Sequence, residues 1–567
     1  MLVHEFLENS AARLPEKVAL ICGERRLTYT ELNIHADWLA LGLHELGIRR
    51  QDRVVIFLDN SVETVVAIYG ILKAGAIFVV INPAMKTKKL NYILRDSGAR
   101  IIITHHDKAR VVKEALNDLP DLDNIVWVGK VPSLSGNAWS KIGHYLWEDL
   151  LTQISQRITE NHRQNSHCDR KRSNPLVARL PHRSAPRNDP DRPLRNPGLT
   201  PRVPSLGACA SAIDIDLATI IYTSGSTGEP KGVMSAHYNV VAAAKSITQY
   251  LENTQSDIII NCLPLAFDYG LYQILMAALF GGTVVLERSF VYPVKVLQRI
   301  SQEGVTGFPI VPTMAAILLQ MKDISRFDLS SLRYISNTGA ALPVAHIKRL
   351  QGLFPHAKLY SMYGLTECKR VSYLPPEELG RRPGSVGKAM PNVEVFIVNE
   401  NGEELGAGEV GELVVRGSNV MQGYWNAPEE TAQTFRPGRY RGETLLYTGD
   451  LFKKDEDGFL YFVARKDDLI KIKGERVSPK EIENAICEIE GVAEAAVIGV
   501  PDDILGHVIK AFVVARDGTK MTGDMIRRYC MKTLEPFMVP KYIEVTPRLP
   551  KSPSGKIDKK RLSSTHP

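Results

Sequence analysis

The chain has 567 residues, of which 44% are hydrophobic and 23% charged, and a net charge of +7. This length predicts a large core domain with a smaller companion, and the composition is that of a globular protein rather than a disordered or fibrous one. No apolar run approaches the roughly 20 residues that a membrane helix needs, and the N-terminus shows no secretory signal. Seven scattered cysteines without a CxxC pair argue against a disulfide framework or a structural zinc site. We therefore expect a cytoplasmic protein without an integral membrane segment.

The first 157 residues alternate short apolar runs with helical patterns. Val54–Leu58, Ala76–Ile81 and Ile101–Thr104 are rich in β-branched residues and predict buried strands. Between the first two, Ser61 opens a predicted helix that Gly75 ends. This alternation of strand and helix predicts parallel α/β layers.

The excess positive charge lies in one segment. Between Arg157 and Pro204, eleven Lys and Arg stand against four Asp and Glu, a balance of +7 that equals the excess of the whole chain. Because prolines are frequent and aromatic residues scarce, we predict that residues 157–206 form a disordered surface insertion. A nucleic-acid-binding tail is the alternative, but the aromatic residues that would stack on bases are missing. We expect no nucleic-acid partner.

A predicted strand at Leu217–Ile221 leads directly into the string Tyr222–Gly232, YTSGSTGEPKG. Its two glycines lack a Cβ atom, so the backbone can turn sharply and bring N–H groups close to an anion. Hydroxyl groups and a lysine add donors and a positive charge suited to a polyphosphate, although the spacing is not that of a Walker A loop. The candidate phosphate-binding residues are Thr223, Ser224, Gly225, Ser226, Thr227, Gly228 and Lys231.

A second string, YSMYGLTEC at Tyr360–Cys368, combines residues with separate chemical uses. Tyr363 offers a flat face to a nucleotide base, and Gly364 permits a turn. Thr366 can donate a hydrogen bond to a phosphate. Glu367 supplies a hard oxygen ligand of the kind that Mg²⁺ prefers.

The last third of the chain changes pattern twice. Short strands and Asn-Gly or Asp-Gly turns predict a small β-barrel over residues 387–464. Beyond a charged segment that starts at Arg465, a mixed pattern predicts a compact α+β unit whose first helix begins with a capping box at Ser478–Glu481. The predicted strands and helix of these two parts are Glu394–Val398, Gly411–Arg416, Phe459–Val463, Ala495–Val500, Ile509–Val514 and Thr522–Leu534.

Three strings in this order resemble the AMP-forming adenylating enzymes, the superfamily of acyl-CoA synthetases, peptide-synthetase adenylation domains and luciferase. They are Tyr222–Gly232, Tyr360–Cys368 and the tail LPKSPSGKID at Leu549–Asp558. The resemblance implies an α/β fold with a large N-terminal domain at 1–464, of layered α/β subdomains plus the small barrel. A mobile α+β lid follows at 465–567.

The resemblance also implies roles for individual residues. Gly339 and Ala340 would lie along the adenine ring, and Asp450, in the string Tyr447–Asp450 after a strand, would accept hydrogen bonds from the ribose hydroxyls. Arg465 would contact the nucleotide, and Asp467 would be the hinge of the lid. Lys556 would enter the adenylation site and act with Thr366 and Glu367, the latter as ligand of Mg²⁺.

The acyl pocket is implied to involve Phe267, Asp268, Tyr272 and Arg370. Asp268 stands where amino-acid-activating relatives pair an aspartate with the substrate ammonium, but it could equally be the N-cap of the predicted helix Leu271–Phe280. A buried unpaired arginine is costly. Arg370 therefore either points to solvent or meets a polar or anionic group of the substrate.

The implied reaction joins a small-molecule carboxylic acid to ATP, forming an acyl-adenylate and pyrophosphate, and then passes the acyl group to a thiol. We expect CoA as the acceptor. A stand-alone enzyme that loads an amino or hydroxy acid onto the phosphopantetheine arm of a separate carrier protein is the alternative, and a non-catalytic nucleotide-binding protein is the third. The sequence does not identify the acid or predict the oligomeric state.

Overall fold

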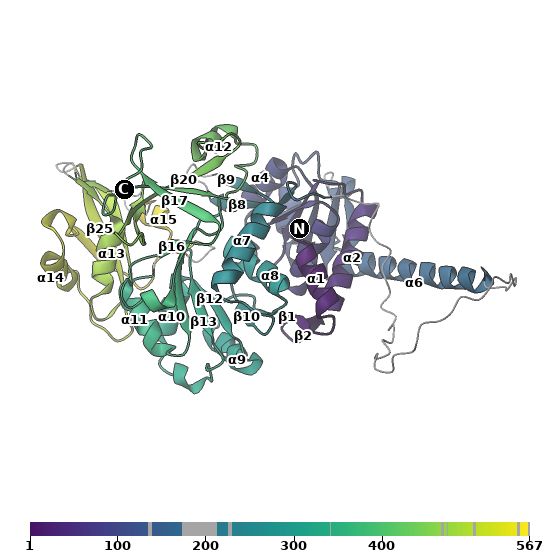
Figure 1. Cartoon of the computed structure of the whole chain (residues 1–567), viewed down its shortest axis with the longest axis horizontal. Helices are drawn as coiled ribbons and strands as arrows, with labels where there is room; N and C mark the ends of the chain where they lie inside the picture. The colour runs from purple at the N-terminus through teal and green to yellow at the C-terminus, as the bar shows by residue number, and fades with distance from the viewer. Residues whose placement is uncertain are drawn as a thin grey trace, which may run out of the picture.

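The computed structural model describes residues 1–133, 139–172, 212–224, 229–340, 342–466, 470–472, 475–502, 506–552 and 556–564. The predicted α/β class is confirmed, with a large N-terminal part and a smaller C-terminal part at the opposite end of the molecule from α1 and α2 (Figure 1). Among the described residues, no helix combines the length and the apolar character needed to cross a membrane.

A seven-stranded sheet in the order β7-β6-β5-β3-β4-β8-β9 forms the first layer. Its pairs are parallel except for the hairpin of β8 and β9, and the predicted strands and the helix that Ser61 caps are confirmed. The strands are β3 (Arg53–Phe57), β4 (Ile77–Val80), β5 (Ala99–His105), β6 (Asn124–Val128), β7 (Gly143–Leu146), β8 (Leu217–Ser224) and β9 (Pro230–Ala236). Its helices are α2 (Tyr29–Glu45), α3 (Val62–Lys73), α4 (Thr87–Ser97), α5 (Ala109–Ala115) and α6 (Trp147–Arg172).

A nine-stranded sheet in the order β16-β15-β14-β13-β12-β10-β11-β1-β2 forms the second layer, with a parallel centre. Its strands are β1 (Val18–Cys22), β2 (Arg25–Thr28), β10 (Ile258–Asn261), β11 (Thr283–Leu286), β12 (Gly307–Ile310), β13 (Tyr334–Asn337), β14 (Lys358–Tyr363), β15 (Ser372–Leu374) and β16 (Lys388–Ala389). The helices are α1 (Glu5–Arg13), α7 (His237–Tyr250), α8 (Asp268–Phe280), α9 (Pro293–Glu303), α10 (Pro312–Gln320) and α11 (Val344–Leu353). The largest apolar core joins the two layers through α2, α3, α7 and α8.

The predicted barrel is instead an antiparallel sheet that, among the described residues, no strand pair closes. The long strand β20 explains this arrangement, because one edge pairs with β18 and the other is shared by β19 and β21 at different heights. The predicted strands themselves are confirmed. The elements are β17 (Val393–Val398), β18 (Gly411–Gly417), α12 (Pro428–Thr434), β19 (Phe435–Pro437), β20 (Thr444–Lys454) and β21 (Leu460–Arg465).

The C-terminal part is of the predicted α+β type: the two predicted strands lie in a three-stranded sheet, β24-β25-β26, and a two-stranded sheet, β22-β23, precedes it. The predicted capping box at Ser478–Glu481 is wrong. Ser478 is the N-cap of α13, but its hydroxyl makes no cap hydrogen bond and instead donates to the Val463 carbonyl oxygen at 2.5 Å. The capping box gives way to a contact that ties α13 to β21. The elements are β22 (Ile470–Ile472), β23 (Glu475–Val477), α13 (Pro479–Cys487), β24 (Val492–Asp502), β25 (Gly506–Ala515), α14 (Gly523–Thr533), β26 (Tyr542–Val545) and α15 (Lys559–Ser564).

The basic segment begins differently from the prediction. Helix α6 continues to Arg172 and extends away from the rest of the molecule, opposite the C-terminal part (Figure 1). Residues 157–172 are therefore helical, because the prolines that would stop a helix begin only at Pro175. The remainder of the predicted insertion, residues 173–206, lies outside the described residues.

Candidate active site

A small pocket lies where the large domain meets the C-terminal tail. It is placed by the start of α8, the loop after β13 and the turn after β14, which follow one another at the carboxyl edge of the nine-stranded sheet, as in ligand sites of open α/β sheets. The lining residues are Phe267, Asp268, Tyr269, Thr338, Gly339, Gly364, Leu365, Thr366, Lys369, Arg370 and Lys556. Seven of these are site residues predicted from the sequence.

Lys556 reaches this pocket from the tail. Averaged over all its atoms the residue is exposed. The end of its side chain nevertheless reaches the pocket, because Cε lies 3.7 Å from the position that a Cβ on Gly339 would take. Gly339 has φ +90°, so a side chain there would be strained, although its Cβ would only reach ordinary van der Waals contact with Lys556. Desolvation lowers the pKa of Lys556, while Asp268, Asp450 and Glu367 oppose this and Arg465 adds to it. The ammonium group therefore sits within range of the predicted nucleotide-binding charges.

Glu367 is held by a tyrosine that the sequence did not single out. The hydroxyl of Tyr424 donates to Glu367 Oε1 at 2.8 Å, and burial raises the pKa of Tyr424 well above its usual value. Tyr424 is itself fixed because its neighbours pair with β9. In the described part of the chain, no Lys or Arg forms an ion pair with Glu367, so this half-buried carboxylate fits a hard cation such as Mg²⁺.

Asp450 lies inside β20 rather than after a strand. The β18–β20 register shifts here, so that residues 448–450 oppose Leu413 alone, and such a bulge re-aims side chains. Tyr363 donates to Asp450 Oδ2 at 2.6 Å and Arg465 to Oδ1 at 3.0 Å. Burial raises the pKa of Asp450, opposed first by Arg465. The three predicted nucleotide contacts therefore form one hydrogen-bonded group.

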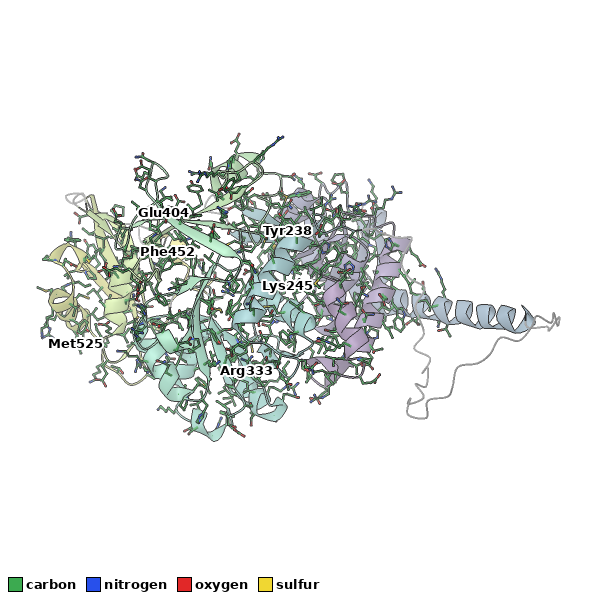
Figure 2. All side chains as sticks on the ribbon, in the orientation of Figure 1. Tyr238, Lys245, Arg333, Glu404, Phe452 and Met525 are labelled. Carbon is green, nitrogen blue, oxygen red and sulfur yellow. The ribbon has the colours of Figure 1, made fainter. Side chains whose placement is uncertain are left out.

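The aromatic ring of Tyr363 is held in place by packing. It packs edge-on against Phe452, with ring centroids 4.8 Å apart, and Phe452, labelled in Figure 2, lies among closely packed side chains. Gly364 next to it is required by packing, because a Cβ there would come within 2.4 Å of the Lys369 carbonyl oxygen. The turn from Gly364 to Arg370 can thus fold back on itself.

The predicted phosphate loop joins β8 and β9. Thr223 in β8 donates from its hydroxyl to the Lys231 carbonyl oxygen at 3.5 Å. Lys231 Nζ lies 3.7 Å from Glu430 and 5.5 Å from the ring centre of Tyr424, so Tyr424 lies between Lys231 and Glu367. Residues 225–228, the side chain of Ser224 and the predicted hinge Asp467 lie outside the described residues. Ala340 follows Gly339 in the loop after β13, where its carbonyl accepts from Asn337.

The acyl side of the pocket contains a buried ion pair. Lys369 Nζ lies 3.2 Å from Asp268 Oδ2 and 4.4 Å from the ring centre of Tyr272, and its side chain is 1% exposed. Burial lowers the pKa of Lys369 to about 7, and Asp268 opposes this shift. Asp268 is not an N-cap, since Phe267 holds that position without a side-chain hydrogen bond and α8 begins at Asp268.

Arg370 does not point to solvent. The residue is 2% exposed, its guanidinium lies 5.2 Å from the ring centre of Tyr269, and its Nε has no hydrogen-bond partner. The sequence had marked Arg370 but assigned no role to Lys369. No spacing in the sequence indicates the ion pair of Lys369, because its partner Asp268 lies 101 residues away and is found only from the fold.

Two family models cover most of the chain. The model of the AMP-binding enzyme matches residues 7–425, and that of the AMP-binding enzyme C-terminal domain matches residues 481–556. The second match ends at Lys556, the residue that the tail brings into the pocket.

Individual relatives agree with this assignment. A long-chain-fatty-acid–CoA ligase of Bacillus subtilis is 32% identical over 99% of this chain and 94% of its own length. Gramicidin S synthase 2 of Brevibacillus brevis is 30% identical over 99% of this chain, which spans 11% of that protein. Among solved structures, the anthranilate CoA ligase AuaEII in complex with anthranoyl-AMP matches with a TM-score of 0.82 and 27% identity, over 100% of this chain and 97% of that one. The chain belongs to the AMP-binding enzyme family and is an AMP-forming ligase of the acyl-CoA synthetase type.

Proposed function

We propose that the protein activates a carboxylic acid with ATP in the pocket at the carboxyl edge of the nine-stranded sheet, and then transfers the acyl group to the thiol of CoA. The observation that carries this proposal is the position of Lys556. It reaches from the C-terminal part into a pocket already lined by Thr366, next to the carboxylates of Glu367 and Asp450.

In the first step, a carboxylate oxygen of the acid attacks the α-phosphorus of ATP and the bond to the β-phosphate oxygen breaks, giving acyl-adenylate and pyrophosphate. Two anions must approach each other, so the site has to neutralise charge and hold the groups in line. Lys556, Thr366 and the β8–β9 loop with Lys231 are suited to this task. Glu367 would hold Mg²⁺, which when bound neutralises phosphate charge.

In the second step, the sulfur of CoA attacks the acyl carbonyl carbon, the thiol proton is lost, and the bond to AMP breaks with its electrons on the phosphate oxygen. We propose that the lid turns about Asp467 between the steps, because Lys556 occupies the pocket in the first arrangement. Rotation would withdraw it and bring residues 473–474 to the site. Such alternation lets one pocket serve two catalytic sets.

The alternative acceptor is a carrier protein loaded with an amino acid. This alternative requires that the carboxylate of Asp268 is free to pair with the ammonium group of the substrate. Lys369 already supplies an ammonium group to that carboxylate at 3.2 Å. This pairing favours an acid without an amino group.

Acid-dependent exchange of labelled pyrophosphate into ATP tests the proposal. A panel of mono- and dicarboxylic, hydroxy and amino acids identifies the activated class, and addition of CoA should convert the adenylate into a thioester seen by mass spectrometry. Exchange without a CoA thioester, together with acylation of a phosphopantetheinylated carrier protein, would favour the alternative.

A further inference from the structure

The acyl side of the pocket has a charge that its own residues do not balance. Lys369 and Asp268 form one ion pair. Arg370 beside them is 2% exposed, and within the described ranges no carboxylate lies within ion-pair distance of it. Removing a guanidinium from water without an anionic partner is unfavourable, so the acyl side of the pocket, with Lys369 and Arg370 against Asp268, is short of one negative charge.

Two buried polar atoms point to the same deficit. Arg370 Nε and the hydroxyl of Tyr272 are both buried and have no hydrogen-bond partner. Lys369 lies against the ring of Tyr272, and Arg370 lies against the ring of Tyr269 one helical turn earlier on α8. Because Arg370 lines the pocket, an apolar acyl tail would leave its Nε unsatisfied, which is unfavourable for a buried donor.

The size and charge of the pocket limit what can fill it. The cavity volume is about 30 Å³, far below the usual range of small-molecule sites, so the structure favours a short acyl tail over a long one. Lys369 and Arg370 would repel a substrate ammonium, and the only pocket carboxylate on this side, within the described residues, is already paired. A short tail with an anionic end satisfies the charge, the free donor of Arg370 and the volume together.

We propose that the activated acid is a short dicarboxylic acid, whose second carboxylate is bound by Arg370. The Lys369–Asp268 pair is then a positioning element. Asp268 is neutralised by Lys369 and so cannot bind a substrate ammonium, and the pair fixes the pocket wall next to Arg370. This proposal rests on the proposed adenylation and names its substrate class.

Pyrophosphate exchange with matched pairs of acids tests the assignment. Butanoate is compared with succinate and pentanoate with glutarate, which differ only in the second carboxylate. The wild-type protein should prefer each dicarboxylate at least tenfold in kcat/KM. Arg370→Gln should abolish this preference while exchange with the monocarboxylates stays or rises, and Arg370→Lys should keep part of it.

Arg381→Gln is the matched control, because the Arg381 side chain is 74% exposed and forms an ion pair with Glu378 at 3.5 Å. It should leave the preference unchanged. A thermal melt of each variant separates lost binding from lost folding, and if Arg370→Gln does not fold, the wild-type pairs and Arg370→Lys decide.

Exchange with the monocarboxylates at equal or higher efficiency would overturn the dicarboxylate assignment and leave the proposed adenylation standing. An Arg370→Gln variant that folds and keeps the preference would likewise overturn the role of Arg370. Absence of exchange with every acid of the full panel would instead contradict the adenylation itself, and the substrate class would fall with it.

Discussion

Tyr424 is the residue that joins two parts of the candidate site. Its hydroxyl donates to Glu367 at 2.8 Å, and its ring faces Lys231 at 5.5 Å. A hydrogen bond to a charged group contributes about 1.5–3 kcal/mol. Tyr424 can therefore decide how Glu367 is oriented without touching the reacting atoms.

Tyr424→Phe should lower the rate of pyrophosphate exchange by about ten- to a hundredfold, the range that such a hydrogen bond implies. Because the orientation of Glu367 is what changes, the Mg²⁺ concentration for half-maximal exchange should rise as well. Tyr440→Phe, at a residue that is 59% exposed, should change neither. A slower Tyr424→Phe enzyme with unaltered Mg²⁺ dependence would show that the tyrosine does not act through Glu367.

For single residues, the sequence predicts which side chains line the site better than which side chains contact one another. Lys556, Thr366 and Gly339 were expected in one place, and they line the same pocket. The Asp268 interpretation failed because its partner, Lys369, is brought close by the fold and not by spacing. A lysine beside an arginine in the sequence gives no indication that one is neutralised and the other is not.

Helix α7 illustrates how an element is fixed by a titratable group. His237, at its start, is 2% exposed and its Nδ1 accepts from the backbone N–H of Val3 at 3.0 Å, which ties the N-terminal segment to the helix. Desolvation, with a smaller effect of His4, lowers the pKa of His237 to about 3. Protonation would remove the acceptor and place a charge in the core.

The free energy of unfolding should therefore fall as the pH drops from about 6.5 toward 3. In this window the unfolded chain binds a proton at His237 and the folded chain does not, so acid favours unfolding. Above pH 6.5 this residue contributes no dependence. His237→Asn keeps an acceptor for the Val3 N–H but does not titrate. In this variant the slope of the unfolding free energy against pH should be smaller on the acid side, by the equivalent of up to one bound proton.

Urea unfolding at several pH values between 7 and 4 measures that slope. The matched control is His356→Asn at an exposed histidine, which should keep the wild-type slope. An unchanged slope in His237→Asn would mean that other groups carry the acid sensitivity.

Element boundaries were predicted where local patterns decide them. The apolar strands of the first sheet and the Ser61 cap need only periodicity and one side chain. The errors lie where distant parts compete for a group: Ser478 donates to Val463 in another strand, and β20 divides one edge between β19 and β21. Such competition is not encoded in the spacing of either partner.

On the scale of the whole molecule, the described part of the basic segment, residues 157–172 of α6, lies away from the site. Helix α6 extends away from the body (Figure 1). Part-way along it, Arg157 forms an ion pair with Glu45 at 2.5 Å. The composition beyond it, rich in proline and arginine, predicts no packed core.

Replacing residues 174–204 by a short Gly-Ser linker should leave pyrophosphate exchange within a few-fold of the parent, with little change in melting temperature. The linker retains α6, which the structure shows to be helical to residue 172. Loss of folding or of exchange would show that the segment packs against the body.

Lys556 is expected to serve one half-reaction only. In the structure it lies in the pocket, where its ammonium would stabilise charge on the α-phosphate as the adenylate forms. Removing one such donor costs about 10²–10³ in rate. After the proposed rotation it would be far from the acyl carbonyl.

The most direct test measures both half-reactions in Lys556→Ala. Pyrophosphate exchange should fall by about 10²–10³, while conversion of a supplied acyl-adenylate and CoA into thioester should remain near the wild-type rate. Lys551→Ala, which removes a tail lysine that pairs with Glu494 at 2.8 Å, should spare both. Asp467→Pro should show the reverse of Lys556→Ala, because a fixed φ at the hinge opposes rotation. Equal loss of both half-reactions in Lys556→Ala and in Asp467→Pro would contradict the alternating lid in this protein.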